Sequence, residues 1–342
     1  MRGPAPTPPL AGVKLVDHLI EDDEQHFAHL WQVTSGFDNA AEGYWSYAGD
    51  RLCFQAELPG VRCDRIFVTD TEDGTWDQIS NGVGKTTCAY FLPGDRKVIY
   101  ASTHLKHTEC PPPLDYSKGY AWAIYAEYDL FVHDLDSGEE TRLTRTWGYD
   151  AEATVSPQGD RIVFTSTRSG DLELWTCDLE GGQLTQITDR LGYDGGGFFS
   201  SDGKWIIYRR TRFASDADHE PYRELLRDWL VRPQAMDIWI VTADGTRQDR
   251  RVTDLGGASF APYFFPGDQR ILFSTNHHDT NKPQVEFDLF AVDLDGENLE
   301  QITTYKGFDS FPMFSPDGEW LVFASNRGGK PGETNLFLAK WR

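Results

Sequence analysis

Two glutamates occupy the same position in a segment that the chain repeats six times. When the copies are aligned on their glycine-containing turns, Glu42 and Glu152 coincide. The equivalent residues in the other four copies are Cys88, Gly196, Ala261 and Phe311. Two carboxylates that face one space can bind a divalent cation or perform acid–base chemistry. Alternatively, neighbouring arginines would satisfy both charges and leave the pair inert.

Charged residues also recur at two other positions of the repeat. Nine residues before a turn glycine stand Asp150, Asp194 and Asp309. Four residues after the aromatic residue that closes a copy stand His104, Arg168, Arg212, His277 and Arg327. These two sets predict one of two arrangements. The first is a charged channel entrance, or mouth, that binds a polar ligand, and the second is a series of structural Asp–Arg ion pairs that connect one repeat to the next. For Arg168 and Arg327 we favour the second arrangement, because repeated pairs in a repeat fold are most simply structural. The candidate ligand-binding residues are Glu42, Asp150, Glu152, Asp194, Arg212, His277 and Asp309.

One short segment concentrates side chains that can ligate a metal. His104, His107, Glu109 and Cys110 lie close together in the chain, and this composition suits zinc. The alternative is a surface loop with ordinary histidines, which we favour because no second ligand cluster stands at a fixed spacing. The sequence therefore requires no cofactor. If a cofactor is bound, the candidate is a calcium or zinc ion, held either between the channel glutamates or by His104, His107 and Glu109.

The five cysteines form no C-x-x-C pair and are too few for a disulfide scaffold. If the protein acts outside the cytoplasm, we expect a disulfide between Cys88 and Cys110. Cys63 is an alternative partner.

The repeated segment is a Gly/Asp turn followed by a short apolar strand that ends in an aromatic residue. The closing aromatics are Phe54, Tyr100, Phe164, Tyr208, Phe273 and Phe323. Their intervals of 44 to 65 residues are typical of four-stranded propeller blades. Short runs of β-branched and aromatic residues, broken by Asp-Gly or Gly-Gly, predict the hairpins that complete each blade. The sequence therefore predicts an all-β fold, a six-bladed β-propeller whose inner strands line a central channel.

The last copy lacks its fourth strand, and the N-terminal region supplies one. Residues 31–34 read Trp-Gln-Val-Thr and match Gln186-Ile187-Thr188. Pairing this strand with the last blade would close the ring and remove exposed sheet edges. We therefore expect a tail over residues 1–25 and a single propeller over residues 26–342.

Two insertions interrupt the regular spacing, at residues 102–128 and 211–236. Both follow the second strand of a blade, so both rise from the same face of the ring, where long loops on a rigid scaffold commonly carry sites. The second insertion predicts a short helix over 221–231, with Pro221 in its first turn. We interpret it as a lid over the mouth of the channel, and it contains Tyr222.

The turn motifs resemble a known family. Ser156-Pro157-Gln158-Gly159-Asp160 and Ser315-Pro316-Asp317-Gly318-Glu319, with the following F-x-S-x-R segments at 164–168 and 323–327, are similar to the repeats of Tol-B-type propellers. The resemblance covers about residues 31 to 342. It implies a bacterial protein that acts in the periplasm or outside the cell, as a binding module, beside a peptidase domain or, in distant relatives, as a polysaccharide lyase. Residues 148–153 and 192–196 also resemble an uncharacterised bacterial subgroup of exported proteins.

Composition excludes some classes of function. The net charge of −22 repels polyanions, so nucleic-acid binding is not expected. No window approaches the apolar length of a membrane span, and residues 1–9 lack a secretory signal pattern. We expect a monomeric, extracytoplasmic recognition module that binds a peptide, a protein partner or a saccharide at the insertion-bearing mouth.

Two alternatives stay open. One is a polysaccharide lyase or hydrolase that uses Glu152, His104, His277, Arg212 and Tyr222, with Arg212 neutralising an acidic sugar. The other is a purely structural propeller.

Overall fold

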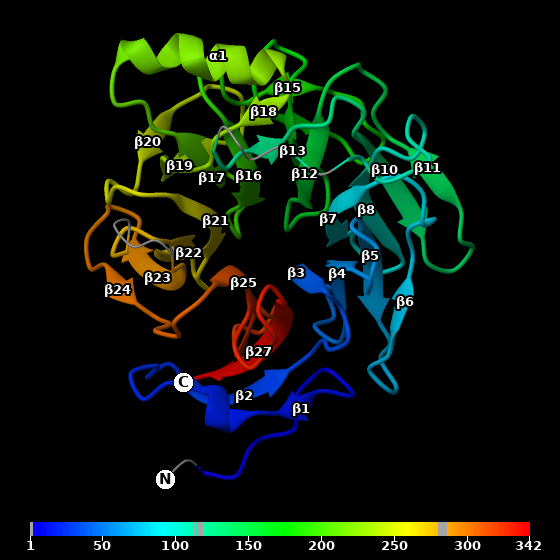
Figure 1. The fold of residues 1–342 in the computed structure, drawn as a ribbon, viewed down its shortest axis with the longest axis vertical. Coiled ribbons are helices and arrows are strands. Elements are labelled where there is room, and N and C mark those ends of the chain that lie inside the picture. Colours follow the sequence, from blue (N-terminus) through cyan, green and yellow to red (C-terminus); the bar gives the residue numbers. More distant parts are fainter. Residues whose placement is uncertain (1–2, 113, 115–118, 280–285) are drawn as a thin grey trace.

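The computed structural model describes residues 3–112, 114, 119–279 and 286–342. Six antiparallel sheets are arranged in a ring, as the repeats predicted (Figure 1). Each of the first five sheets forms from four strands in chain order, counted from the centre of the ring outward. The fold is therefore a six-bladed β-propeller.

The strands of the first three blades have the following bounds. Blade 1 contains β3 (Asn39–Trp45), β4 (Leu52–Glu57), β5 (Asp64–Thr69) and β6 (Trp76–Gln78). Blade 2 contains β7 (Thr86–Phe91), β8 (Lys97–Ser102), β10 (Asp129–Asp134) and β11 (Glu140–Arg142). Blade 3 contains β12 (Asp150–Val155), β13 (Ile162–Ser166), β14 (Glu173–Cys177) and β15 (Thr185–Gln186).

The other blades follow the same plan. Blade 4 contains β16 (Asp194–Phe199), β17 (Trp205–Thr211), β19 (Met236–Thr242) and β20 (Asp249–Arg251). Blade 5 contains β21 (Ser259–Phe264), β22 (Arg270–Thr275), β23 (Asp288–Asp293) and β24 (Glu300–Gln301). Blade 6 contains β25 (Asp309–Phe314), β26 (Trp320–Ser325), β27 (Asn335–Trp341), β2 (Phe27–Gln32) and β1 (Lys14–Leu15).

Blade 6 joins the two ends of the chain, as predicted. Strand β2 pairs with β27, for example Trp31 with Leu338, and β1 adds a short fifth strand outside β2. A 3-10 helix, η1 (Asp17–Leu19), connects β1 to β2. This closure covers the sheet edge that β27 would otherwise expose.

The blades share two packing devices that the repeat encodes. All six closing aromatics have no exposed surface. In addition, a hydroxyl after the fourth strand accepts a hydrogen bond of 2.8–3.0 Å from the third-strand backbone of the same blade. The residues with this hydroxyl are Ser80, Thr144, Thr188, Thr253, Thr303 and Thr34. Thr34 completes the set from the N-terminal side, so the closing strand carries the same device as the others.

The innermost strand of each blade contains a β-bulge at one equivalent residue. Its φ lies between 49° and 63° in all six blades, at Glu42, Cys88, Glu152, Gly196, Ala261 and Phe311. The strand register shifts at each of these positions. A bulge re-aims the side chain that it carries. Because the bulge recurs in every blade, it belongs to the architecture, and the residue type at each bulge decides what lines the channel.

The two insertions lie between β8 and β10 and between β17 and β19. They contain β9 (Trp122–Ala123), the 3-10 helix η3 (Asp216–Asp218), α1 (His219–Arg227) and β18 (Leu230–Val231). β9 and β18 pair antiparallel, so the insertions support one another. The helix begins before Pro221 and ends earlier than predicted, because Trp229 adopts a left-handed φ of 57° that turns the chain into β18. Among the described residues, no helix is long and apolar enough to cross a membrane.

Candidate functional site

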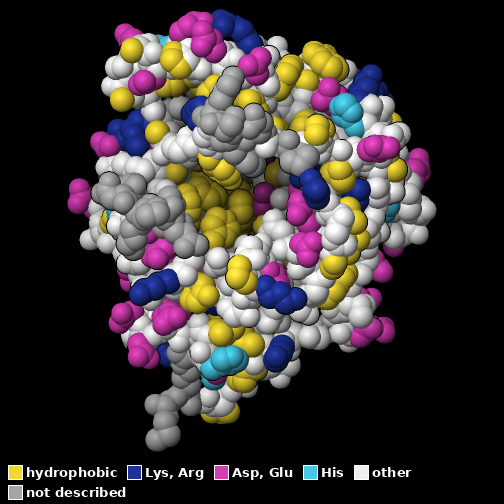
Figure 2. Space-filling model, viewed as in Figure 1, with side chains coloured by type: hydrophobic (Ala, Val, Ile, Leu, Met, Phe, Trp, Pro, Cys, Tyr) yellow, Lys and Arg dark blue, Asp and Glu magenta, His cyan; other side chains and the backbone are white. Residues whose placement is uncertain are grey.

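The central channel widens under the insertions into a chamber of about 1080 Å³. All six blades contribute to its wall, and the insertions contribute residues that include Trp122, Tyr125 and Gln234. Figure 2 shows the hollowed mouth, with apolar side chains on one side and charged side chains on the other. The chamber therefore has two chemically different walls.

The polar wall comes from the bulges of blades 1 to 3, which place Glu42, Cys88 and Glu152 in the chamber. Glu152 accepts hydrogen bonds from Thr165 Oγ1 (2.6 Å) and from the Tyr193 hydroxyl (2.6 Å), and it pairs with Arg209. Burial alone would raise the pKa of Glu152, but Arg209 and the hydroxyl donors hold that pKa below its usual value. Glu152 is therefore a satisfied, ionised carboxylate.

Glu42 has a different environment at the same bulge position. Its Oε2 accepts one long hydrogen bond, of 3.3 Å, from the Tyr44 hydroxyl. Burial raises the pKa of Glu42 to about 7, and the negative charge of Glu152 adds to the rise. A hydrogen bond with the Cys88 thiol and the charge of Arg209 act in the opposite direction. Near neutral pH this carboxyl group is therefore poised between its two protonation states.

The opposite wall is aromatic. Phe260, Phe287, Phe308 and Phe311 line the chamber and contact one another in a closed cycle. Their ring centroids are 5.2–6.4 Å apart. Trp122 of the first insertion meets both Phe260 (6.2 Å) and Tyr193 (6.4 Å), so it joins the two walls.

The three recurring aspartates lie inside the blades, at 0–1% exposure. Asp150 pairs with Arg168 of its own blade, at 3.0 Å. Asp309 likewise pairs with Arg327 of its own blade, at 2.7 Å. The expected pairing between neighbouring blades is therefore wrong for Arg168 and Arg327, because each aspartate begins the first strand and each arginine follows the second strand of the same sheet.

Asp194 takes a different partner from the one that the alignment suggested. Arg210 binds both of its carboxylate oxygens, at 2.6 and 2.7 Å. Arg212 instead pairs with Asp237, at 2.7 Å. The reason is that Arg210 stands directly opposite Asp194 in the strand pairing, where blade 3 has Ser166 opposite Asp150.

The candidate histidines, Glu109 and Tyr222 lie outside the chamber wall, and His107 and Glu109 line a separate pocket at the first insertion. His104 Nε2 lies 3.0 Å from Glu140, and His107 Nε2 lies 3.5 Å from Glu127, whereas Glu109 is exposed. His277 packs on Phe290 at 4.7 Å, and the Tyr222 hydroxyl donates to Asp171 at 2.5 Å. Within the described residues, no three His, Cys, Asp or Glu side chains are grouped to hold a metal ion.

Sequence reasoning missed Arg209 and most of the aromatic wall. Arg209 directly follows the closing aromatic Tyr208, at a position where the other copies carry Gln55, Ala101, Thr165, Ser274 and Ala324. A lone arginine among small and uncharged equivalents was the available signal. The phenylalanines gave no comparable signal, because Phe287 and Phe308 lie in connections outside the repeat motif.

The structure contains a disulfide between Cys63 and Cys110, whose Cα atoms are 5.7 Å apart. The preferred Cys88–Cys110 pair is wrong, because the bulge aims Cys88 into the channel, and the alternative partner Cys63 is the one used. The bond attaches the first insertion to the loop between β4 and β5.

We expect protein purified under oxidising conditions to show three reactive thiols in denaturant, from Cys53, Cys88 and Cys177. Prior reduction should raise this number to five. A thiol titration with and without reductant measures both values. Five thiols in the unreduced sample would contradict the disulfide.

Comparisons with known proteins agree with this architecture. The family model described as TolB beta propeller domain matches residues 122–217 and 232–333, more than half of the chain. An uncharacterized protein of Agrobacterium fabrum is 24% identical over 201 residues, which cover 57% of this chain and 46% of that protein. The chain thus spans less than half the length of the curated relatives that it matches.

Two solved structures show the same fold. TolB from Acinetobacter baumannii superposes with a TM-score of 0.59 at 17% identity, over 86% of this chain and 64% of that chain. A protein from Xanthomonas campestris described as a gluconolactonase superposes with a TM-score of 0.61 at 15% identity, over 100% and 99% of the two chains. At these identities the likeness concerns the fold alone.

Proposed function

Since this chain belongs to the TolB β-propeller family, we propose that it is a recognition module that binds its ligand in the chamber at the insertion-bearing mouth. One observation carries the proposal. The chamber is a concave space of about 1080 Å³ with one aromatic wall and a few convergent polar groups on the other, which is the usual form of a ligand site. Its size suits a small molecule or the end of a peptide, of a partner protein or of a saccharide chain.

We also propose that the protein acts in the periplasm or outside the cell. The Cys63–Cys110 disulfide supports this location, because such bonds persist in oxidising compartments. The disulfide also holds in place the insertion that bears Trp122, so an oxidising environment would preserve the chamber.

Binding accounts for the placement of polar groups better than catalysis does. A lyase or hydrolase built from Glu152 with His104, His277, Arg212 and Tyr222 would need these side chains to converge. Of these five residues, Glu152 lines the chamber, and in the described part of the chain the other four do not. Glu152 is also occupied by Arg209, which leaves it a weak proton acceptor.

Filling the chamber tests the proposal. Ala261 occupies a bulge whose counterpart in blade 6 is Phe311, with φ values of 49° and 53°. The backbone therefore accepts a phenylalanine at this position, and A261F should occupy the chamber without unfolding the ring. We expect ligands found by ligand-observed NMR in a library of peptides, oligosaccharides and small molecules to lose binding at least tenfold in A261F. Hits that bind A261F and the wild type equally would place the ligand site elsewhere.

A further inference from the structure

The six bulge residues divide the chamber into two halves. Around the ring, Glu42, Cys88 and Glu152 are neighbours, and Gly196, Ala261 and Phe311 complete the circle. A ligand that fills this space meets carboxylates on one side and phenyl rings on the other. It must therefore carry a polar group and an apolar body.

On the polar side of the chamber, some carboxylates have a paired cation and others do not. Asp64 pairs with Lys85, and Glu152 pairs with Arg209. Glu42 and Glu57 also line the chamber, and among the described residues no Lys, Arg or His nitrogen forms an ion pair with either carboxylate. Burial raises the pKa of both Glu42 and Glu57. The third cation that lines the chamber, Arg62, is exposed to solvent, and in the described part of the chain it forms no ion pair with Glu42 or Glu57. These two acidic groups therefore lack a paired cation.

A comparison of equivalent positions explains the difference between the two bulge glutamates. Glu152 of blade 3 receives its cation from Arg209 of blade 4. The residue of blade 2 that corresponds to Arg209 is Ala101, which cannot supply a charge to Glu42 of blade 1. Lys85 is held by Asp64. Blade 1 therefore presents a half-buried, unpaired carboxyl group at a site where blade 3 has a complete ion pair.

We propose that the chamber selects ligands that carry a protonated amine on an aromatic or aliphatic body, with the ammonium group beside Glu42 and the body against Phe260 and Phe311. This inference rests on the proposed function and names the class of its ligand. The ammonium group supplies the cation that Ala101 does not, and it donates charge-assisted hydrogen bonds to the carboxylate. The phenyl rings add apolar contact and attraction for a cation.

The protonation of Glu42 is linked to this binding. The charged groups that act on it are Glu152, Arg209 and Asp64, and the Cys88 thiol and the Tyr44 hydroxyl form hydrogen bonds with it. An ammonium ion favours the ionised form of a carboxyl group. Amine binding below pH 7 should therefore release a proton, and the affinity for an amine should rise as the pH increases from 6 to 8.

Calorimetry with 2-phenylethylamine and its neutral analogue 2-phenylethanol tests the inference. We expect the wild type to prefer the amine by about tenfold at pH 7.5. E42Q should remove this preference, whereas E173Q should keep it, because Glu173 is a buried carboxyl of blade 3 outside the chamber. At pH 6, repeating the titration in buffers of different ionisation enthalpy should show release of close to one proton in the wild type.

Three results of the calorimetry would overturn the inference. These are equal affinity for the amine and the alcohol, an amine preference that E42Q retains, and no measurable binding of the amine. The pH dependence of the wild type gives an answer even if E42Q does not fold. If library ligands lose binding in A261F but those with an amine bind no more tightly than those without one, this ligand class is rejected. The proposed function is then still supported.

Discussion

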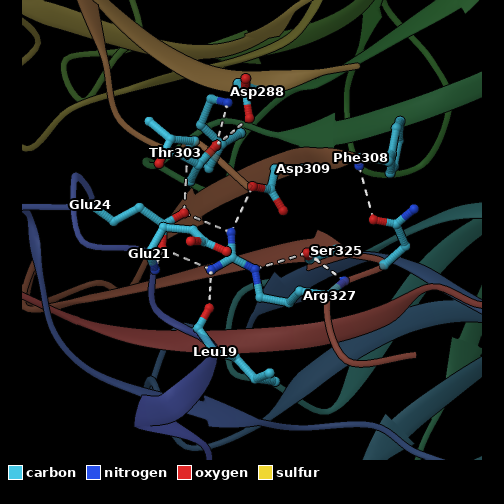
Figure 3. A network of polar contacts seen from close by, with 12 residues as sticks. Leu19, Glu21, Glu24, Asp288, Thr303, Phe308, Asp309, Ser325 and Arg327 are labelled. Carbon is cyan, nitrogen blue, oxygen red and sulfur yellow. Dashed lines mark hydrogen bonds and ion pairs between the residues drawn. The ribbon is translucent and has the colours of Figure 1, made fainter. Parts of the chain in front are cut away.

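Replacing Arg327 by alanine is expected to lower the free energy of unfolding by about 3–5 kcal/mol, because it leaves two buried carboxylates without a cation. The guanidinium group of Arg327 has no exposed surface and lies between Glu24 and Asp309, whose side chains are also fully buried. It binds Glu24 at 2.9 and 3.0 Å and Asp309 at 2.7 Å, as Figure 3 shows. This network connects the segment before β2 to blade 6, so its loss weakens the closure of the ring.

Urea denaturation followed by tryptophan fluorescence measures this effect. R227A is the control, because Arg227 pairs with Glu220 on the exposed face of α1 and should change stability by no more than about 0.5 kcal/mol. R168A should fall between the two, since Arg168 pairs with one carboxylate rather than two. A denaturation midpoint of R327A equal to that of the wild type would show that the network does not stabilise the closure.

The two bulge glutamates are expected to respond in opposite ways to the same substitution. E152Q leaves the buried guanidinium of Arg209 without a carboxylate, so we expect a loss of about 2–4 kcal/mol. E42Q removes a carboxyl group that, among the residues that the structure describes, forms no ion pair. At pH 8 it should make the protein more stable by about 1–3 kcal/mol, because ionised Glu42 is unfavourable in the folded state.

The pH dependence of E42Q follows from the direction of the pKa shift. The pKa of Glu42 rises to about 7 in the folded protein. Protonated Glu42 therefore contributes stability that is complete below its ordinary pKa and is lost as the pH rises through 7. The advantage of E42Q over the wild type should be small at pH 5 and grow up to pH 8. Thermal unfolding of the wild type, E42Q and E152Q across this range measures it, and a constant difference would mean that Glu42 does not titrate there.

The sequence determines the overall architecture of this protein. The ring, its six blades, its closing strand and its two insertions follow from the amino-acid sequence, since turn glycines and closing aromatics such as Phe164 recur at blade spacing. These signals are local and are repeated six times, so one unusual copy does not obscure them. The equivalence of Glu42 and Glu152 at the bulge is also visible in the alignment of the copies.

Partnership between distant residues was decided only by the tertiary structure. Glu152 is satisfied because Arg209 reaches it from the next blade, and Glu42 is not, because Ala101 occupies the corresponding position. In the same way Cys110 bonds to Cys63 rather than Cys88, and Phe287 and Phe308 reach the chamber from connecting segments. Each of these contacts joins residues of different blades, or of the loops and insertions between strands. Contacts between residues that are far apart in the chain leave no local pattern in the sequence. The partners of the chamber residues therefore follow only from the tertiary structure.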